Sequence, residues 1–173
     1  NPNADFQMVL DDGSEFLDRN SNPSPGFLGF FYQPGSAGST AATMGAFNQN
    51  GFGWSTAGLL AGGLGFSTII HEALHGLGLD HPHDGQSILP GLDPNVPNFP
   101  FGYYGEHGLN QGVYTVMSYN DGLAGTNTTQ TQGNAATPMA LDIAILQDIY
   151  GANTTHNNGN NTYELPDSRD KWM

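Results

Sequence analysis

The sequence predicts an α/β (α+β) fold, with a twisted mixed sheet, one helix behind it and a second helix near the end of the chain. Two short runs of strand composition, Phe6–Leu10 and Phe27–Tyr32, support the sheet, and turn-forming residues end each run. Two segments with apolar periodicity, Ser67–Leu77 and residues 138–150, support the helices. The chain has 173 residues, which is enough for one domain with its own hydrophobic core.

Each helical segment carries start and stop signals. Ser67 or Thr68 is the expected N-cap of the first helix, and glycines stand at its far end. Thr137 is the expected cap of the second helix, Pro138 suits its first turn, and Gly151 ends it. The expected apolar face of the second helix consists of Met139, Leu141, Ile145, Leu146, Ile149 and Tyr150. Residues 35–53 give weak signals, and residues 82–112 and 120–136 are expected to be loops.

The charge balance excludes some classes of partner. The chain has 3 Lys and Arg residues against 16 Asp and Glu residues, a formal net charge of −13. We therefore expect neither nucleic acid nor an anionic membrane surface as a partner, because few cationic side chains are available to contact phosphates. Cysteine is absent, which excludes a disulfide framework, a thiolate zinc site and a cysteine nucleophile. Strong acidity favours a saline or calcium-rich exterior, although many proteins are simply acidic.

Residues 71–81, H-E-A-L-H-G-L-G-L-D-H, carry the chemistry. His71 and His75 are four residues apart, so on a helix they share one face and can point at one ion. Glu72 lies beside them and can take a proton from a metal-bound water. Gly78 lets the chain leave the helix sharply and bring His81 round as a third ligand. Three neutral imidazoles with an open fourth position are typical of a catalytic zinc site.

This pattern, H-E-x-x-H-x-x-G-x-x-H, resembles the zinc signature of the metzincin proteases. Val116-Met117-Ser118-Tyr119 is similar to the methionine turn of that clan, and its Met-Ser-Tyr form, with Pro82 after the third histidine, resembles the serralysin family. Residues 138–153 are similar to that family's later helix and the Tyr-Gly-Ala-Asn that follows it. The resemblance covers residues 66–165 well, and it implies a metzincin-like zincin domain with a twisted mixed sheet.

The resemblance also implies roles for particular residues. His71, His75 and His81 would ligate one catalytic Zn²⁺, and Glu72 would be the general base and later the proton donor. Tyr119 would ligate the resting metal and then stabilise the oxyanion. Met117 would form an apolar floor under the histidines, and Asp142 would anchor the region beneath the methionine turn. The implied protein is a secreted, bacterial-type exoprotease that hydrolyses peptide bonds in proteins.

The substrate is expected to bind as an extended strand along a sheet edge, through backbone hydrogen bonds. The candidate edge lies in Phe27–Tyr32, and the candidate substrate-binding residues in it are Gly29, Phe30, Phe31 and Tyr32. An ordinary core strand is the alternative interpretation of this segment. The acidic composition suits basic substrates, but charge alone does not establish a cleavage preference.

The sequence departs from the family pattern at both ends. The family usually has a long first helix and early strands ahead of the zinc helix, and a calcium-binding β-roll after the protease domain. We therefore expect residues 1–165 to form an N-terminally short catalytic domain, with 166–173 as a tail or the start of a missing C-terminal region. A second copy or another fragment is the expected partner if core surface is exposed. Ca²⁺ is an additional candidate ligand of the Asp- and Asn-rich loops.

Three alternatives stay open. A truncated, inactive chain would keep the metal site and serve as a metal-stabilised binding or adhesion fragment. An astacin-like or matrixin-like protease is the alternative among enzymes, but the lack of cysteine disfavours the first and Tyr119 disfavours the second. His83, together with Asp84, fits either an ordinary loop or a group that supports the metal ligands or holds a second metal.

Overall fold

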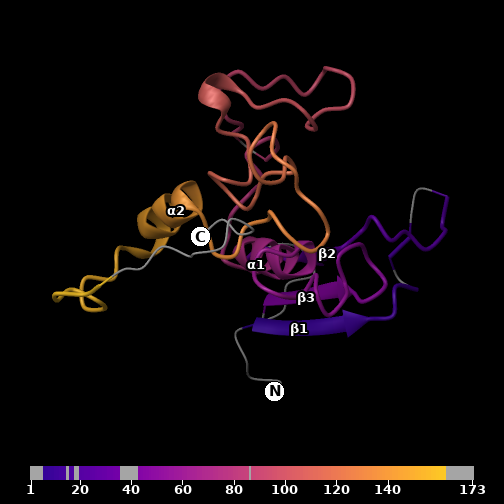
Figure 1. The fold of residues 1–173 in the computed structure, drawn as a ribbon, viewed down its shortest axis with the longest axis horizontal. Helices are drawn as coiled ribbons and strands as arrows, with labels where there is room; N and C mark the ends of the chain where they lie inside the picture. Colours follow the sequence, from indigo (N-terminus) through magenta and orange to yellow (C-terminus); the bar gives the residue numbers. More distant parts are fainter. Residues whose placement is uncertain (1–5, 15, 18–19, 36–42, 86, 163–173) are drawn as a thin grey trace.

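The computed structural model describes residues 6–14, 16–17, 20–35, 43–85 and 87–162. Its strands are β1 (Phe6–Asp11), β2 (Gly29–Phe31) and β3 (Thr43–Asn48). Its helices are α1 (Leu64–Gly76) and α2 (Ala140–Tyr150), with a short 3-10 turn, η1 (Glu106–Gly108), between them. The strand order is β1-β3-β2, with β1 parallel and β2 antiparallel to β3. The predicted mixed α/β architecture is therefore confirmed, with a small sheet (Figure 1).

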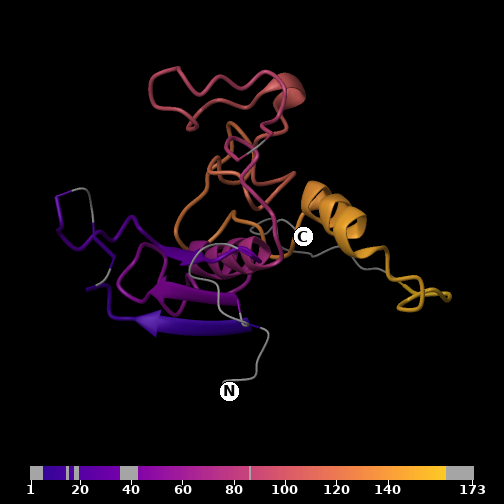
Figure 2. The same cartoon turned by 180° about the vertical axis from the view of Figure 1, so that it is seen from behind.

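Helix α1 lies against β2 and β3, and the irregular segments that follow it lie on its other side (Figures 1 and 2). Two glycines allow the close approach of helix and sheet. A Cβ atom at Gly76 would lie 2.7 Å from the ring of Phe6 and 2.8 Å from the ring of Phe31. A Cβ atom at Gly45 would lie 2.2 Å from the ring of Phe31. The buried Phe31 side chain thus fills the space that both glycines leave free.

Strand β3 lies in the segment that gave only weak sequence signals. Its sequence, Thr-Met-Gly-Ala-Phe-Asn, lacks a run of β-branched residues, and glycine weakens a strand in isolation. The strand forms because it pairs with a neighbour on each side and because Gly45 accommodates Phe31. Tertiary packing, which local propensity does not contain, decides this element.

Both helices begin elsewhere than predicted. Helix α1 starts at Leu64 after Gly63, so the expected cap at Ser67 or Thr68 is wrong. The Thr68 hydroxyl instead donates to the Leu64 carbonyl one turn earlier, 2.9 Å away. Helix α2 starts after Met139 and not at Thr137, because the Asp142 carboxylate accepts the Met139 amide at 2.7 Å and does the work of a cap. Its end at Gly151, where φ is +81°, is as predicted.

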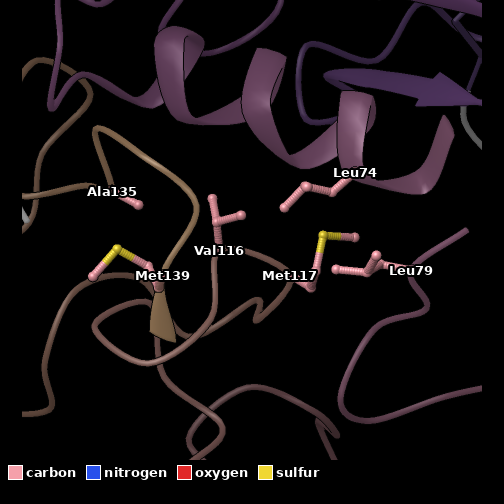
Figure 3. Close-up of a cluster of buried hydrophobic side chains, with 6 residues drawn as sticks. All are labelled: Leu74, Leu79, Val116, Met117, Ala135 and Met139. Carbon is pink, nitrogen blue, oxygen red and sulfur yellow. The ribbon is translucent and has the colours of Figure 1, made fainter. Parts of the chain in front are cut away.

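The main apolar core lies beneath α1 and joins three parts of the chain. Leu74 comes from α1 and Leu79 from the turn after it, whereas Met139 precedes α2. All six buried members are shown in Figure 3: Leu74, Leu79, Val116, Met117, Ala135 and Met139. The predicted apolar face of α2 is wrong in part. Leu146 packs against this core, but Ile145, Ile149 and Tyr150 are 47%, 49% and 59% exposed.

The long segments predicted as loops between α1 and α2 are irregular in the structure and contain only η1 as a helical turn. They lie above α1 in Figure 1, with α2 to one side. Gln111–Tyr119, predicted as a short strand or turn, forms turns. None of the helices in the described part of the chain is both long and apolar enough to cross a membrane. The predicted tail at 166–173 lies outside the described residues.

Candidate metal centre

The three predicted ligands converge. Helix α1 carries His71 and His75 one turn apart, and Gly78, at φ +97°, turns the chain so that His81 returns toward them. The Nε2 atom of His81 lies 3.1 Å from Nε2 of His71 and 3.0 Å from Nε2 of His75. The ligand atoms of these three residues form a group that can hold a metal ion.

Hydrogen bonds fix the tautomer of each ring. Nδ1 of His71 lies 2.8 Å from the Val116 carbonyl, and Nδ1 of His75 lies 2.7 Å from the Leu79 carbonyl. Both partners can only accept, so each Nδ1 carries the proton and each Nε2 carries a lone pair. Nδ1 of His81 donates in the same way to Oδ2 of Asp84, 2.8 Å away. Three lone pairs therefore point into one small space, where a cation would relieve their repulsion.

The donor set fits zinc. Zn–N bonds of about 2.0–2.1 Å in tetrahedral geometry require nitrogens about 3.3–3.4 Å apart, which is close to the separations in this cluster. Zinc also requires neutral imidazoles. Burial, reinforced by the neighbouring His75, lowers the pKa of His71 to about 3. Burial and then His81 lower the pKa of His75. The first two ligands are thus held neutral at neutral pH.

Glu72 occupies the face of α1 that points toward β2, beside His71. Its side chain is 7% exposed, and burial raises its pKa to about 8 in the metal-free protein. Gly29 of β2 makes room for it, since a Cβ atom at position 29 would lie 3.2 Å from Cγ of Glu72. Glu72 and His71 line the same cavity. A carboxylate at this place can exchange a proton with a molecule bound next to the histidines.

Tyr119 lies against the histidines. Its ring centroid is 4.6 Å from that of His81 and 5.9 Å from that of His71. The residue remains 43% exposed, so its ring faces the solvent-filled side of the centre. Burial of the phenol, followed by the charges of Glu72 and Asp84, raises the pKa of Tyr119 to about 12. The hydroxyl is therefore protonated at neutral pH and able to donate a hydrogen bond.

Met117 is 1% exposed and belongs to the main apolar core together with Leu74 and Leu79 (Figure 3). The turn that carries it is tied to α2 by one buried carboxylate. Asp142 accepts the Thr115 hydroxyl at 2.5 Å, the Val116 amide at 2.9 Å and the Met139 amide at 2.7 Å. The side chain of Asp142 thus anchors the turn from below.

His83 contacts the centre without joining the three ligands. It is 4% exposed, its ring stacks on His81 at 5.0 Å, and its centroid lies 4.7 Å from that of Tyr119. Its buried Nδ1 has no hydrogen-bond partner among the described residues. The structure favours a role of His83 and Asp84 at this centre over that of ordinary loop residues, because Asp84 bonds His81 and His83 packs on its ring. His81, His83 and Asp84 also form a second group that can hold a metal ion, so support of the ligands and a second metal both stay predictions.

A cavity of about 340 Å³ opens beside His71 and Glu72. Its lining includes two residues that sequence reasoning missed, Phe101 and Asp121. The Phe101 ring stacks on Tyr119 at a centroid distance of 5.9 Å. The loop that carries Phe101 is fastened by Asn120, whose side chain accepts the Gly102 amide at 2.7 Å and donates to the Pro100 and Tyr103 carbonyls at 3.2 Å. Asp121 lies two residues after Tyr119 in the sequence, whereas Phe101 lies 18 residues before it, and no local pattern indicates that either residue lines a cavity.

The four candidate substrate-binding residues lie in different environments in the structure. Gly29 lines the cavity, whereas Phe31 is 6% exposed and belongs to the packing between β2 and α1. Strand β2 pairs only with β3 among the described strands, so it is an edge strand. Leu28 and Tyr32 use their backbone groups to bond β3, at 3.0 and 2.9 Å. Because a ladder alternates, the backbone groups of Gly29 and Phe31 point away from β3.

Comparison with known proteins identifies relatives of this chain. No family model matches it. It is 39% identical to a serralysin of Proteus mirabilis over 59% of this chain and 19% of that protein. It is 30% identical to metallopeptidase AprA of Pseudomonas marginalis over 88% of this chain and 31% of that protein. It is 29% identical to a serralysin of a Photorhabdus species over 84% of this chain and 28% of that protein.

The chain thus spans between about a fifth and a third of the length of these relatives. The longer alignments include the metal-centre histidines and the segment of the methionine turn, because they cover more than four fifths of the chain. The predicted resemblance is confirmed, and the chain is a relative of the serralysin metalloproteases.

Proposed function

We propose that residues 1–165 act as the catalytic domain of a secreted, zinc-dependent endopeptidase with a metzincin-like zincin fold. The observation that carries this proposal is the convergence of the Nε2 atoms of His71, His75 and His81 beside the buried side chain of Glu72, which lines a cavity. The sequence similarity to serralysin metalloproteases supports the same class. One Zn²⁺ is the proposed cofactor, held by His71, His75 and His81, with Tyr119 as an additional ligand in the resting state.

When bound, the zinc ion supplies a Lewis acid that activates water and polarises the substrate carbonyl. Glu72 takes the proton of the attacking water, whose oxygen adds to the carbonyl carbon of the peptide bond. Glu72 then delivers the proton to the amide nitrogen as the C–N bond breaks, so an amine and a carboxylic acid form, and the acid passes its proton to the amine to give an ammonium and a carboxylate. The protonated Tyr119 hydroxyl donates a hydrogen bond to the oxyanion that develops on the carbonyl oxygen.

The substrate is proposed to lie along β2. The outward backbone groups of Gly29 and Phe31 are available to an extended peptide, which would add a strand at this edge. Phe30 and Tyr32 would contact it only from the neighbouring positions, since their side chains pack against each other at 5.3 Å. Protein and peptide substrates, self-association or a second fragment, and Ca²⁺ binding stay predictions.

The proposal is tested by digestion of casein with the zinc-loaded protein, with and without a chelator. We expect hydrolysis that chelation abolishes and added zinc restores. Glu72→Gln should retain one zinc per chain and lose nearly all turnover, whereas Glu106→Gln, the same change on the exposed η1 turn, should retain turnover. Hydrolysis that survives chelation would contradict the metalloprotease. Zinc binding with no hydrolysis by the unmodified chain would favour the binding or adhesion fragment.

A further inference from the structure

The cavity beside the metal centre has one charged group that the proposed reaction does not use. Asp121 lines it together with His71, Glu72 and Tyr119. Its carboxylate makes no hydrogen bond or ion pair with any residue that the structure describes. Two other acids of the region are fully engaged, Asp84 with His81 and Asp142 with the methionine turn. Asp121 is therefore available to a ligand that enters the cavity.

The remaining walls are mostly apolar. Phe27 and Leu28 come from the segment that leads into β2, Leu64 from the start of α1, Val116 from the methionine turn and Phe101 from the loop that Asn120 fastens. The Ser118 hydroxyl in the wall already donates to Asn110 at 2.8 Å, and the Thr68 hydroxyl to Leu64. A largely apolar cavity with a carboxylate that the proposed reaction does not use, Asp121, suits a side chain with an aliphatic stem and a cationic head.

The chain carries only three cationic residues against 16 acidic ones. The three cationic residues of the sequence, Arg19, Arg169 and Lys171, all lie outside the described residues. The net charge of −13 attracts cationic peptides toward the cleft and repels acidic ones. The cavity volume of about 340 Å³ lies at the lower end of ligand pockets, which run from about 300 to 1,000 Å³, so it has room for one long side chain.

We propose that this cavity selects substrates with arginine or lysine next to the cleaved bond, and that Asp121 is the residue that sets this preference. The inference rests on the proposed peptidase function and names its substrate class. The guanidinium of arginine can engage the carboxylate with two parallel hydrogen bonds, so we expect substrates with arginine to be preferred over those with lysine. Leucine would fill the apolar walls but would leave Asp121 partly desolvated and unpaired. Glutamate would meet a like charge.

The test uses matched fluorogenic peptides that carry arginine, citrulline, leucine or glutamate on either side of the cleaved bond. Citrulline has the shape of arginine without its charge. We expect kcat/KM for arginine to exceed that for citrulline by about tenfold, the effect of one charge-assisted pair. Asp121→Asn should reduce the ratio to near one, and Asp121→Lys should make glutamate the preferred residue. Asp148→Asn removes the same charge from the exposed surface of α2 and should leave the ratio unchanged.

A binding measurement separates this inference from the peptidase proposal. On the zinc-loaded Glu72→Gln background, fluorescence anisotropy of the labelled arginine and citrulline peptides reports affinity without turnover. An arginine preference that Asp121→Asn removes supports the inference even if no peptide is cleaved. Equal affinity for arginine and citrulline, or a preference that persists in Asp121→Asn, overturns it even if every peptide is cleaved.

Discussion

Val116 links the buried Asp142 to His71, because its amide binds the Asp142 carboxylate and its carbonyl binds the ring of His71. Oδ2 of Asp142 accepts the Val116 amide at 2.9 Å, and the Val116 carbonyl accepts Nδ1–H of His71 at 2.8 Å. One residue of the methionine turn thus connects the start of α2 to the metal centre. The orientation of His71 thus depends on a carboxylate to which it is linked only through Val116.

Asp142→Ala should both destabilise the fold and weaken metal binding. Asp142 is 0% exposed, and its removal leaves the Thr115 hydroxyl and two backbone amides without their acceptor. We expect a loss of about 3 kcal/mol or more in the free energy of unfolding. Urea denaturation of the chelated protein measures it. Asp148→Ala on the exposed side of α2 should change the value by less than about 0.5 kcal/mol. Equal effects of the two variants would refute the anchoring role.

Asp84→Asn should lower zinc affinity by about tenfold to a hundredfold while leaving the three ligands in place. Asp84 accepts Nδ1–H of His81 at 2.8 Å, and this hydrogen bond fixes the orientation of the ring. Competition with a chromophoric chelator measures the affinity. Asp93→Asn, a charge-matched change in an exposed loop turn, is the control. An unchanged affinity in Asp84→Asn would show that this pair is incidental.

Tyr119→Phe should lower kcat by about a hundredfold with little change in KM, because the hydroxyl is proposed to bind only the developing oxyanion. The ring contacts with His81 and His71 do not need the hydroxyl and are retained. Steady-state kinetics on one fluorogenic peptide measures both parameters, and Tyr104→Phe serves as the control outside the cavity lining. A variant with undiminished kcat would exclude this role for Tyr119.

The chelated protein should lose stability as the pH falls below 6.5. The pKa of His71 is about 3 in the fold and 6.5 as a free side chain, so the unfolded chain binds the proton first. This residue alone contributes up to about 1.4 kcal/mol per pH unit in that window. Glu72 acts oppositely between pH 4.5 and 8, because its folded pKa is raised to about 8. Chelated Glu72→Gln should therefore lose stability more steeply on acidification than the chelated unmodified protein. Thermal unfolding of both proteins from pH 8 to 4.5 compares the two slopes.

Gly76→Ala should separate α1 from the sheet. The new Cβ atom would lie 2.7–2.8 Å from the rings of Phe6 and Phe31, which are held between helix and strands. We expect a destabilisation of about 1–3 kcal/mol from this overpacking, in spite of the better helix propensity of alanine. Gly159→Ala, where a Cβ atom meets nothing within 4 Å, should have no comparable effect. Urea denaturation distinguishes the two variants.

Local patterns indicate the convergence of the three histidines better than they indicate the sheet. The positions of His71, His75 and His81 follow from helical spacing and a glycine turn, which are properties of the chain within eleven residues. Strand β3 depends instead on partners more than ten residues away along the chain, so its own composition carries little signal. The local sequence favours Thr137 as the cap of α2, whereas the cap that forms depends on Asp142 and its hydrogen bonds to the distant methionine turn.

Asp121 and Phe101 show the same limit at the cavity. A single acid in a Gly- and Asn-rich segment has the composition of an ordinary loop, and nothing local indicates that it lines a cavity. For the apolar face of α2, the local pattern predicts too many buried positions rather than too few. Helical periodicity predicted six positions, but the core contains only those that lie opposite α1 and the methionine turn.

Asn120 follows Tyr119 directly and secures the loop that carries Phe101 through both ends of one amide group. Tyr119 and the loop of Phe101 are consequently linked through the side chain of the intervening residue. We expect a peptide that displaces this loop to shift Tyr119 as well, so that substrate binding and the position of the phenol are coupled. Substitution of Phe101 to change the substrate preference would leave that link intact, whereas substitution of Asn120 would separate the position of the loop from that of Tyr119.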